Sequence, residues 1–142
     1  MIAVYTNILV YAHRESLPRH AAALARLREL AEADALWAVP VFCLGEFVRI
    51  VTHRSLFDPP STLPEATAAL DALLASPSLA VLRPGDRYWP LFRDAVHEGR
   101  AAGNLAFDAQ IVALCREHGV RALLTEDRDF TRFTDFPLEH LS

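Results

Sequence analysis

The sequence contains no lysine, so all 14 of its basic residues are arginines. The formal net charge is −4, and this acidic balance argues against a general binder of polyanions. Arginine binds phosphate groups through paired hydrogen bonds and therefore suits a local phosphate contact on an acidic protein. A bias in the base composition of the gene would also remove lysine, so its absence alone defines no function.

Cysteine and long apolar runs are also scarce. The two cysteines, Cys43 and Cys115, lie within apolar helical patterns and lack metal-binding spacing, as expected for small core residues of a cytosolic protein. No apolar run approaches the length needed to cross a bilayer. The first residues, Met1 to Val4, lack the basic head and apolar region of a signal peptide. We therefore expect a cytoplasmic protein without membrane contact.

The 142 residues, 52% of them hydrophobic, predict one domain over residues 1–142 with a full core. Strands are expected at 2–5, 35–39, 79–82 and 121–125, with an edge strand at 136–141. Helices are expected at 8–13, 18–33, 40–52, 62–75, 86–102 and 104–119, with a short helical turn at 130–133; Pro90 makes the fifth start near Trp89 or kink there. This alternation predicts an α/β domain with a parallel central sheet.

The helix predicted at 104–119 carries a carboxylate beside its apolar face. Asn104 is a helix start signal and Gly119 a stop signal. Asp108 lies in the first turns, where the helix dipole favours its charge but burial would be costly. A lone Asp here is also explained by a role in helix initiation, so further residues must decide whether the position is functional.

Further acidic residues are predicted near the same sheet edge. Glu46 interrupts the apolar face of the 40–52 helix, while Asp127 and Asp129 follow the strand at 121–125. In parallel sheets, ligands bind outside the carboxyl ends of the strands. Clustered carboxylates repel one another unless a cation joins them, and oxygen ligands without Cys or His select Mg²⁺ or Mn²⁺. One or two such ions can support phosphodiester cleavage.

Each acidic residue also has a structural explanation. Glu46 could pair with Arg49 on the same helix, and Asp127 and Asp129 could be turn residues after a strand. Their joint position at one sheet edge favours a functional cluster.

The chain resembles the PIN domain and, within it, the VapC-type toxins of toxin–antitoxin pairs. The resemblance is carried by residues 3–12, Glu46-Phe47, residues 104–113 and, most specifically, Thr125 to Phe130. It implies a three-layer α/β/α fold and a Mg²⁺- or Mn²⁺-dependent endoribonuclease of a type II toxin–antitoxin system. It also implies an RNA substrate, a homodimer and a VapB-like antitoxin.

The resemblance assigns roles to individual residues. Glu46, Asp108 and Asp127 match the acidic metal site of the family, and Asp129 matches a secondary acidic position whose role varies. Asn7 and Thr125 match supporting polar positions.

One position departs from the family pattern. Where the family has Asp-Thr-Asn after the first strand, this chain has Tyr5-Thr6-Asn7. A phenol has a pKa of about 10 and is a neutral, bulky and poor ligand for Mg²⁺. Tyr5 is therefore expected to weaken metal binding and impair catalysis, either as an inactivating substitution or in a divergent homologue that has lost catalysis.

Two other functions compete with an active ribonuclease. Asp127 to Thr131 also resembles the nucleophile motif of haloacid-dehalogenase-type phosphatases, but only eleven residues follow Thr131 and the lysine of that family is absent. The stronger alternative is a non-catalytic pseudo-nuclease that folds, dimerises and binds an antitoxin without cutting RNA.

Several predictions concern surfaces. The helices at 6–12, 18–33 and 62–75 carry more apolar residues than one core face needs, which indicates an interface. The resemblance implies that this interface includes a groove for an antitoxin helix. Proximity to the predicted site makes Arg14, Arg49, Arg54 and Arg128 candidates for phosphate contact. The six histidines show no ligand spacing and are predicted to be surface or cap residues.

Overall fold

A five-stranded parallel sheet forms the centre of the molecule. The computed structural model describes residues 1–142, with strand order β3-β2-β1-β4-β5 and every neighbouring pair parallel. The strands are β1 (Ile2–Val4), β2 (Trp37–Pro40), β3 (Leu79–Leu82), β4 (Ala122–Leu124) and β5 (Leu138–Glu139). The chain moves from β1 outward to β3 and then returns to β4 on the other side of β1. The strand order therefore switches direction between β1 and β4, where parallel sheets form ligand crevices.

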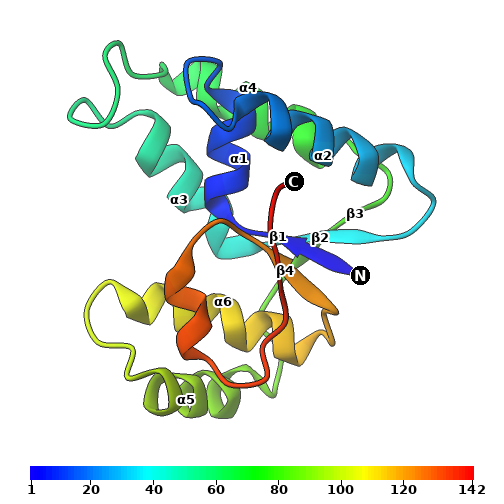
Figure 1. Cartoon of the computed structure of the whole chain (residues 1–142), viewed down its shortest axis with the longest axis vertical. Helices are drawn as coiled ribbons and strands as arrows, with labels where there is room; N and C mark the ends of the chain where they lie inside the picture. Colours follow the sequence, from blue (N-terminus) through cyan, green and yellow to red (C-terminus); the bar gives the residue numbers. More distant parts are fainter.

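Six α-helices cover the sheet in the predicted three-layer α/β/α arrangement. They are α1 (Thr6–His13), α2 (His20–Glu32), α3 (Val41–Val51), α4 (Leu63–Leu74), α5 (Tyr88–Gly99) and α6 (Leu105–Glu117), followed by the short 3₁₀ helix η1 (Arg128–Arg132). Figure 1 shows α1, α2 and α4 on one side of the strands and α5 and α6 on the other. None of the helices is both long and apolar enough to span a bilayer.

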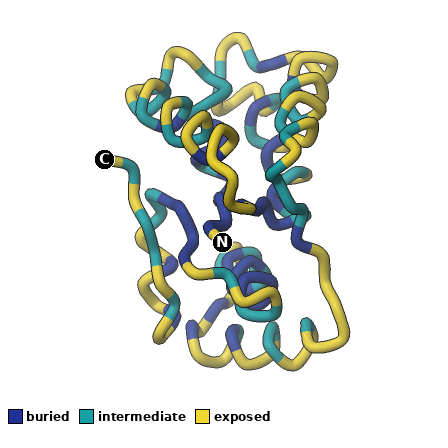
Figure 2. Tube along the Cα trace, turned by 90° about the vertical axis from the view of Figure 1, so that its right-hand side faces the viewer, coloured by how far each residue is buried: buried dark blue, intermediate teal, exposed yellow.

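The core lies where the central strands meet α6. All residues of β1, β2 and β4 are buried, because helices cover both faces of the sheet. Residues 111–115 of α6 are also buried, so this helix reads as almost continuously apolar. Figure 2 shows these buried stretches at the middle of the molecule, beneath helices whose outer surfaces are exposed. The site residues that follow β1 and β4, or lie on α6, are therefore attached to the most rigidly packed part of the fold.

Local signals explain most helix boundaries. Thr62 caps α4, because its Oγ1 accepts from the Glu65 N–H at 3.2 Å while Glu65 Oε1 accepts from the Thr62 N–H at 3.0 Å. After α6, Gly119 takes a left-handed conformation with φ of 64°, which ends the helix as predicted. Asn104 immediately precedes α6, as predicted, but its side chain makes no hydrogen bond that caps the helix.

Several predicted boundaries differ from the structure by one to three residues, and Pro40, predicted to start a helix, is the last residue of β2. Helix α1 begins at Thr6, so Thr6 and Asn7 belong to its first turn, and Tyr5 is the extended residue before it. Helix α2 begins at His20, two residues after Pro18. Helix α5 begins at Tyr88, close to the predicted start near Trp89, and it includes Pro90 because a first-turn residue needs no N–H for the helix.

Candidate active site

A cleft of about 670 Å³ opens at the carboxyl ends of β1 and β4. Its wall brings together side chains that are far apart in the sequence: Tyr5, Glu46, Arg49, Gly103, Asn104, Leu105, Phe107, Asp108, Asp127 and Asp129. The cleft therefore collects Tyr5 and all four predicted acidic residues at one end of the sheet.

Tyr5 and Asp108 are the two buried residues of this group. Tyr5 directly follows β1 and is only 6% exposed. Its ring meets Phe130 edge-on, with centroids 4.8 Å apart, and lies 6.3 Å from the ring of Phe107. Aromatic contacts of this kind hold the ring in one orientation. The Tyr5 hydroxyl is thereby directed at the acidic residues.

The Tyr5 hydroxyl contacts two carboxylates. It donates to Asp108 Oδ1 at 2.9 Å and lies 3.4 Å from Glu46 Oε1. Since a hydroxyl has one proton, the shorter contact to Asp108 is the stronger hydrogen bond. Burial, reinforced by the charges of Asp108 and Glu46, raises the pKa of Tyr5 well above its usual range. Tyr5 is therefore a neutral hydrogen-bond donor throughout the physiological pH range.

Asp108 is an acidic side chain held inside the protein. It lies in the first turn of α6 and is 5% exposed. Burial raises the pKa of Asp108 to about 6, and the hydrogen bond from Tyr5 opposes this shift. The neighbouring charges of Asp127, Asp129 and Glu46 raise the pKa further. A nearby positive charge would oppose this shift, because it stabilises the ionised carboxylate.

Asp127 and Asp129 complete an acidic group with Asp108. One carboxylate oxygen from each of the three lies within 4.8 Å of the others. Asp127 Oδ1 accepts from the Asp129 N–H at 2.9 Å, so the first aspartate caps η1 and fixes the backbone of the second. Oxygens that bind one Mg²⁺ at about 2.1 Å lie within about 4.2 Å of each other, so small side-chain rotations suffice for shared coordination. This donor set fits a hard divalent cation.

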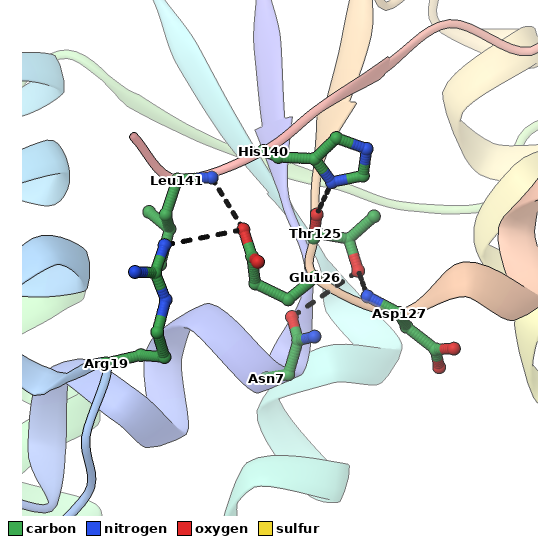
Figure 3. Close-up of polar contacts among 7 residues, drawn as sticks. All are labelled: Asn7, Arg19, Thr125, Glu126, Asp127, His140 and Leu141. Atoms are coloured by element: carbon green, nitrogen blue, oxygen red, sulfur yellow. Dashed lines mark hydrogen bonds and ion pairs between the residues drawn. The ribbon is translucent and has the colours of Figure 1, made fainter.

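Thr125 connects the acidic group to the first helix. Its Oγ1 accepts from the Asp127 N–H at 3.0 Å and lies 3.5 Å from Asn7 Oδ1 on α1 (Figure 3). Thr125 is fully buried, so these contacts are shielded from water. Thr125 and Asn7 therefore position Asp127 from beneath the cleft, and neither lines it.

The C-terminal segment holds the same loop from its other side. His140 Nδ1 lies 2.7 Å from the carbonyl oxygen of Thr125, and Glu126 Oε1 accepts from the Leu141 N–H at 2.6 Å (Figure 3). The Arg19 guanidinium lies 3.9 Å from the same Glu126 oxygen. No local sequence pattern predicts these contacts, because they depend on β5 pairing beside β4.

Glu46 lies at the edge of the acidic group. It projects from α3 and falls outside the set of oxygens that converge within 4.8 Å. Arg49, one turn along, approaches Glu46 Oε2 at 3.4 Å. The predicted Glu46–Arg49 pair is therefore present, although both residues also line the cleft.

Only one of the four predicted phosphate-binding arginines lines the cleft, namely Arg49. Arg14 instead donates to the Pro59 carbonyl at 3.0 Å and lies over the ring of Phe57, so its role is to fasten the loop after α3. Arg54 and Arg128 are exposed outside the cleft wall. Proximity in sequence to an acidic residue was a poor guide for these side chains.

Other predicted features keep structural roles. Both cysteines are buried and free, and burial raises the pKa of Cys43 to about 12, so its thiol is inert at neutral pH. The histidines lie outside the cleft wall. His13 and His20 are half-buried and make local contacts, with Ser61 Oγ at 2.9 Å and the Tyr11 carbonyl at 2.8 Å respectively.

A second, apolar cavity of about 170 Å³ lies between the helices on one side of the sheet. Its wall comes from α1, α2, α3 and α4 and consists of Leu9, Ala12, His13, Leu27, Phe47, Ala69, Leu70 and Leu73. Three of these helices are those for which the sequence predicted an excess of apolar residues.

Comparison with known proteins identifies the family. Residues 2–135 match the PIN domain, and the chain belongs to the PIN-domain family. Within that family it is a VapC-type protein. It is 39% identical over 140 residues to VapC ribonuclease Mb2897 of Mycobacterium bovis, covering 99% of this chain and 95% of the relative. It is 35% identical over 133 residues to ribonuclease VapC31 of Mycobacterium tuberculosis, covering 94% and 93% respectively.

A solved structure shares the fold. The VapBC2 structure from Rickettsia felis, bound to a DNA fragment from its promoter, contains a chain that aligns with a TM-score of 0.68 and 21% identity. The alignment covers 100% of both chains. At this identity the similarity concerns the fold.

Proposed function

We propose that this chain is the toxin component of a VapBC-type pair, with the site of a metal-dependent endoribonuclease whose hydrolytic activity is impaired by Tyr5. The observation that carries the proposal is the convergence of Asp108, Asp127 and Asp129 in one cleft with Glu46 at its edge. The names of the relatives, VapC ribonucleases, support RNA as the substrate.

The acidic residues would hold Mg²⁺ or Mn²⁺ through carboxylate oxygens. Such an ion, when bound, polarises a phosphodiester and lowers the pKa of a water molecule. Asp108 and Asp127 place negative charge at the floor of the cleft, and Asp129 adds a third carboxylate at its exposed side. Thr125, supported by Asn7, fixes the loop that carries Asp127. Arg49 supplies the positive charge in the cleft wall that an RNA phosphate requires.

Tyr5 impairs this site in two ways. It stands where the family pattern places the first carboxylate, so the cluster has one negative charge fewer than that pattern. Its hydroxyl also occupies Asp108 Oδ1 through a 2.9 Å hydrogen bond, and its ring fills the space beside that carboxylate. Misplacing reacting groups by about 1 Å can reduce a rate about 100-fold. We therefore expect Tyr5 to impair catalysis, while the chain still folds and binds its antitoxin.

The apolar cavity between α1, α2, α3 and α4 is the proposed seat of a VapB-like antitoxin helix. Its lining is almost entirely apolar, and amphipathic helices bind such grooves through residues spaced one turn apart. The Rickettsia felis relative was solved as a VapBC assembly, which supports a partner of this kind. We also propose a homodimer that acts in the cytoplasm, where its RNA substrate is found.

Two measurements on the chain as it stands test this proposal. Its VapB-like antitoxin should bind the chain with the same affinity as it binds the Tyr5→Asp variant, because the apolar cavity does not include Tyr5. A turnover assay on RNA with Mn²⁺ separates an impaired ribonuclease, which cleaves slowly, from the alternative of a non-catalytic pseudo-nuclease, which never cleaves. Failure to bind the antitoxin, with recovery in the Tyr5→Asp variant, would contradict the expectation that the chain with Tyr5 binds its antitoxin.

A further inference from the structure

Tyr5 does more than remove one ligand, because it also divides the acidic group. The hydroxyl lies between Asp108 Oδ1 at 2.9 Å and Glu46 Oε1 at 3.4 Å. The hydroxyl therefore occupies the place of a cation that would bridge these two oxygens. The phenol ring cannot easily withdraw, since it is 6% exposed and packed edge-on against Phe130.

Each oxygen of Glu46 has a polar neighbour. Oε1 faces the Tyr5 hydroxyl, and Oε2 faces the Arg49 guanidinium at 3.4 Å. A positive charge beside a carboxylate reduces its attraction for a cation, and Arg49 remains charged at every physiological pH. Glu46 is also absent from the group of oxygens that converge within 4.8 Å.

The three aspartates are differently placed. Asp108 keeps its second oxygen, Oδ2, without a protein hydrogen bond, and Asp127 likewise uses only Oδ1. Asp129 contributes its backbone N–H to the loop, which leaves its carboxylate free. Four oxygens without protein partners are therefore available on the three aspartates.

We infer that, in this chain, the divalent cation is held by Asp108, Asp127 and Asp129, and that Tyr5 and Arg49 exclude Glu46 from coordination. This inference rests on the cation site of the proposed function. It makes Asp129 a principal ligand instead of a secondary one. It also predicts that the contribution of Glu46 depends on which residue occupies position 5.

The test is binding of Mn²⁺ to the purified full-length chain, followed by electron paramagnetic resonance of the free ion. Asp129→Asn should weaken binding at least about tenfold, a loss seen even for groups that only support a ligand. Glu46→Gln should change the affinity for Mn²⁺ by no more than about twofold, because Glu46 is not a ligand in this chain. Asp34→Asn, an exposed acid before β2 and so at the opposite sheet edge, is the matched control.

The same variants in a Tyr5→Asp background complete the test. There Glu46→Gln should weaken Mn²⁺ binding about tenfold, because the hydroxyl that separated Glu46 from Asp108 is gone. Glu46→Ala repeats the comparison with a side chain that cannot bind metal, and melting temperatures confirm folding. The inference is overturned if the chain binds no Mn²⁺, if Asp129→Asn has no effect, or if Glu46→Gln weakens binding equally with Tyr5 and with its Asp variant. This test measures Mn²⁺ binding and not RNA cleavage. A chain that binds Mn²⁺ as expected but cleaves no RNA would therefore reject the proposed function and leave the assignment of the cation ligands intact.

Discussion

The Tyr5 hydroxyl donates a 2.9 Å hydrogen bond to Asp108 Oδ1, which joins the end of β1 to the first turn of α6. Both residues are more than nine-tenths buried. A buried carboxylate is costly unless it is paired, and here a neutral phenol provides the compensation that a cation would give in the family's site. The contact thus explains how the chain can fold with the Asp108 carboxylate buried.

Replacing Tyr5 by Phe should show the value of this hydrogen bond. The variant keeps the ring and its packing but leaves Asp108 Oδ1 without a donor, so the free energy of unfolding at neutral pH should fall by about 1–3 kcal/mol. Urea unfolding in the presence of a chelator measures this free energy for the chain and for the variant. Tyr11→Phe is the control, because the hydroxyl of half-buried Tyr11 makes no hydrogen bond within the chain. Equal stability of the two variants would show that the Tyr5 contact is energetically neutral.

The raised pKa of Asp108 predicts the pH dependence of stability. Its pKa rises from 3.8 to about 6 on folding, chiefly through burial, so the folded state binds this proton more tightly than the unfolded state. Stability is therefore gained as the pH falls through 6 and lost as it rises between about pH 4 and pH 7. Relative to Asp108→Asn, the chain should lose about 1–3 kcal/mol over that interval in metal-free buffer. Parallel stability curves for the two proteins would contradict the assignment.

Thr125 should matter both for the cation and for the fold. Thr125→Val keeps the shape of the side chain but removes the acceptor for the Asp127 N–H and the link to Asn7. We expect a loss of about 1–3 kcal/mol in stability and a decrease of about tenfold in Mn²⁺ affinity. Thr67→Val, which alters an exposed threonine on α4, should leave Mn²⁺ binding unchanged. A loss of stability without any change in metal affinity would limit Thr125 to a structural role.

The apolar cavity gives a prediction for the antitoxin. Leu73→Glu places a charge in the cavity wall, and binding of the VapB-like antitoxin should weaken by about 2 kcal/mol or more, as for a buried anchor at an interface. Leu74→Glu alters the neighbouring residue, which is 41% exposed and not part of that wall, and should bind normally. Isothermal titration calorimetry measures both. Similar binding by the two variants would place the antitoxin elsewhere.

Much of the fold follows from local sequence. The run Leu79–Leu82 forms a strand at the predicted residues, and the Thr62–Glu65 capping box with Pro64 sets the start of α4. Alternating strand and helix patterns predicted an α/β domain with a parallel sheet, and the family resemblance implied its three layers. These features depend on neighbours a few residues apart, so a sequence pattern is enough to find them.

Long-range geometry was harder to predict. The aspartates could be grouped because they follow a strand or begin a helix at one sheet edge, but the sequence could not show that Glu46, in the middle of its helix, would stand apart from them. Nor could it show that His140 and Leu141 hold the Asp127 loop. Arg14 looked close to the site in the sequence, yet it turns toward Pro59. Side-chain direction depends on packing partners that no local pattern specifies.

The most direct test of the account is the rate of RNA cleavage, with Mg²⁺ or Mn²⁺, by the chain, by Tyr5→Asp and by the double variant Tyr5→Asp/Asp108→Asn. The account predicts little or no cleavage by the chain and a rate at least about 100-fold higher for Tyr5→Asp, because the ion regains a ligand and its proper position. Asp108→Asn should remove that gain, since an amide keeps the shape without the charge. Equal rates for the chain and Tyr5→Asp would contradict the role given to Tyr5. A Tyr5→Asp protein that binds the metal and leaves RNA intact would contradict the ribonuclease assignment.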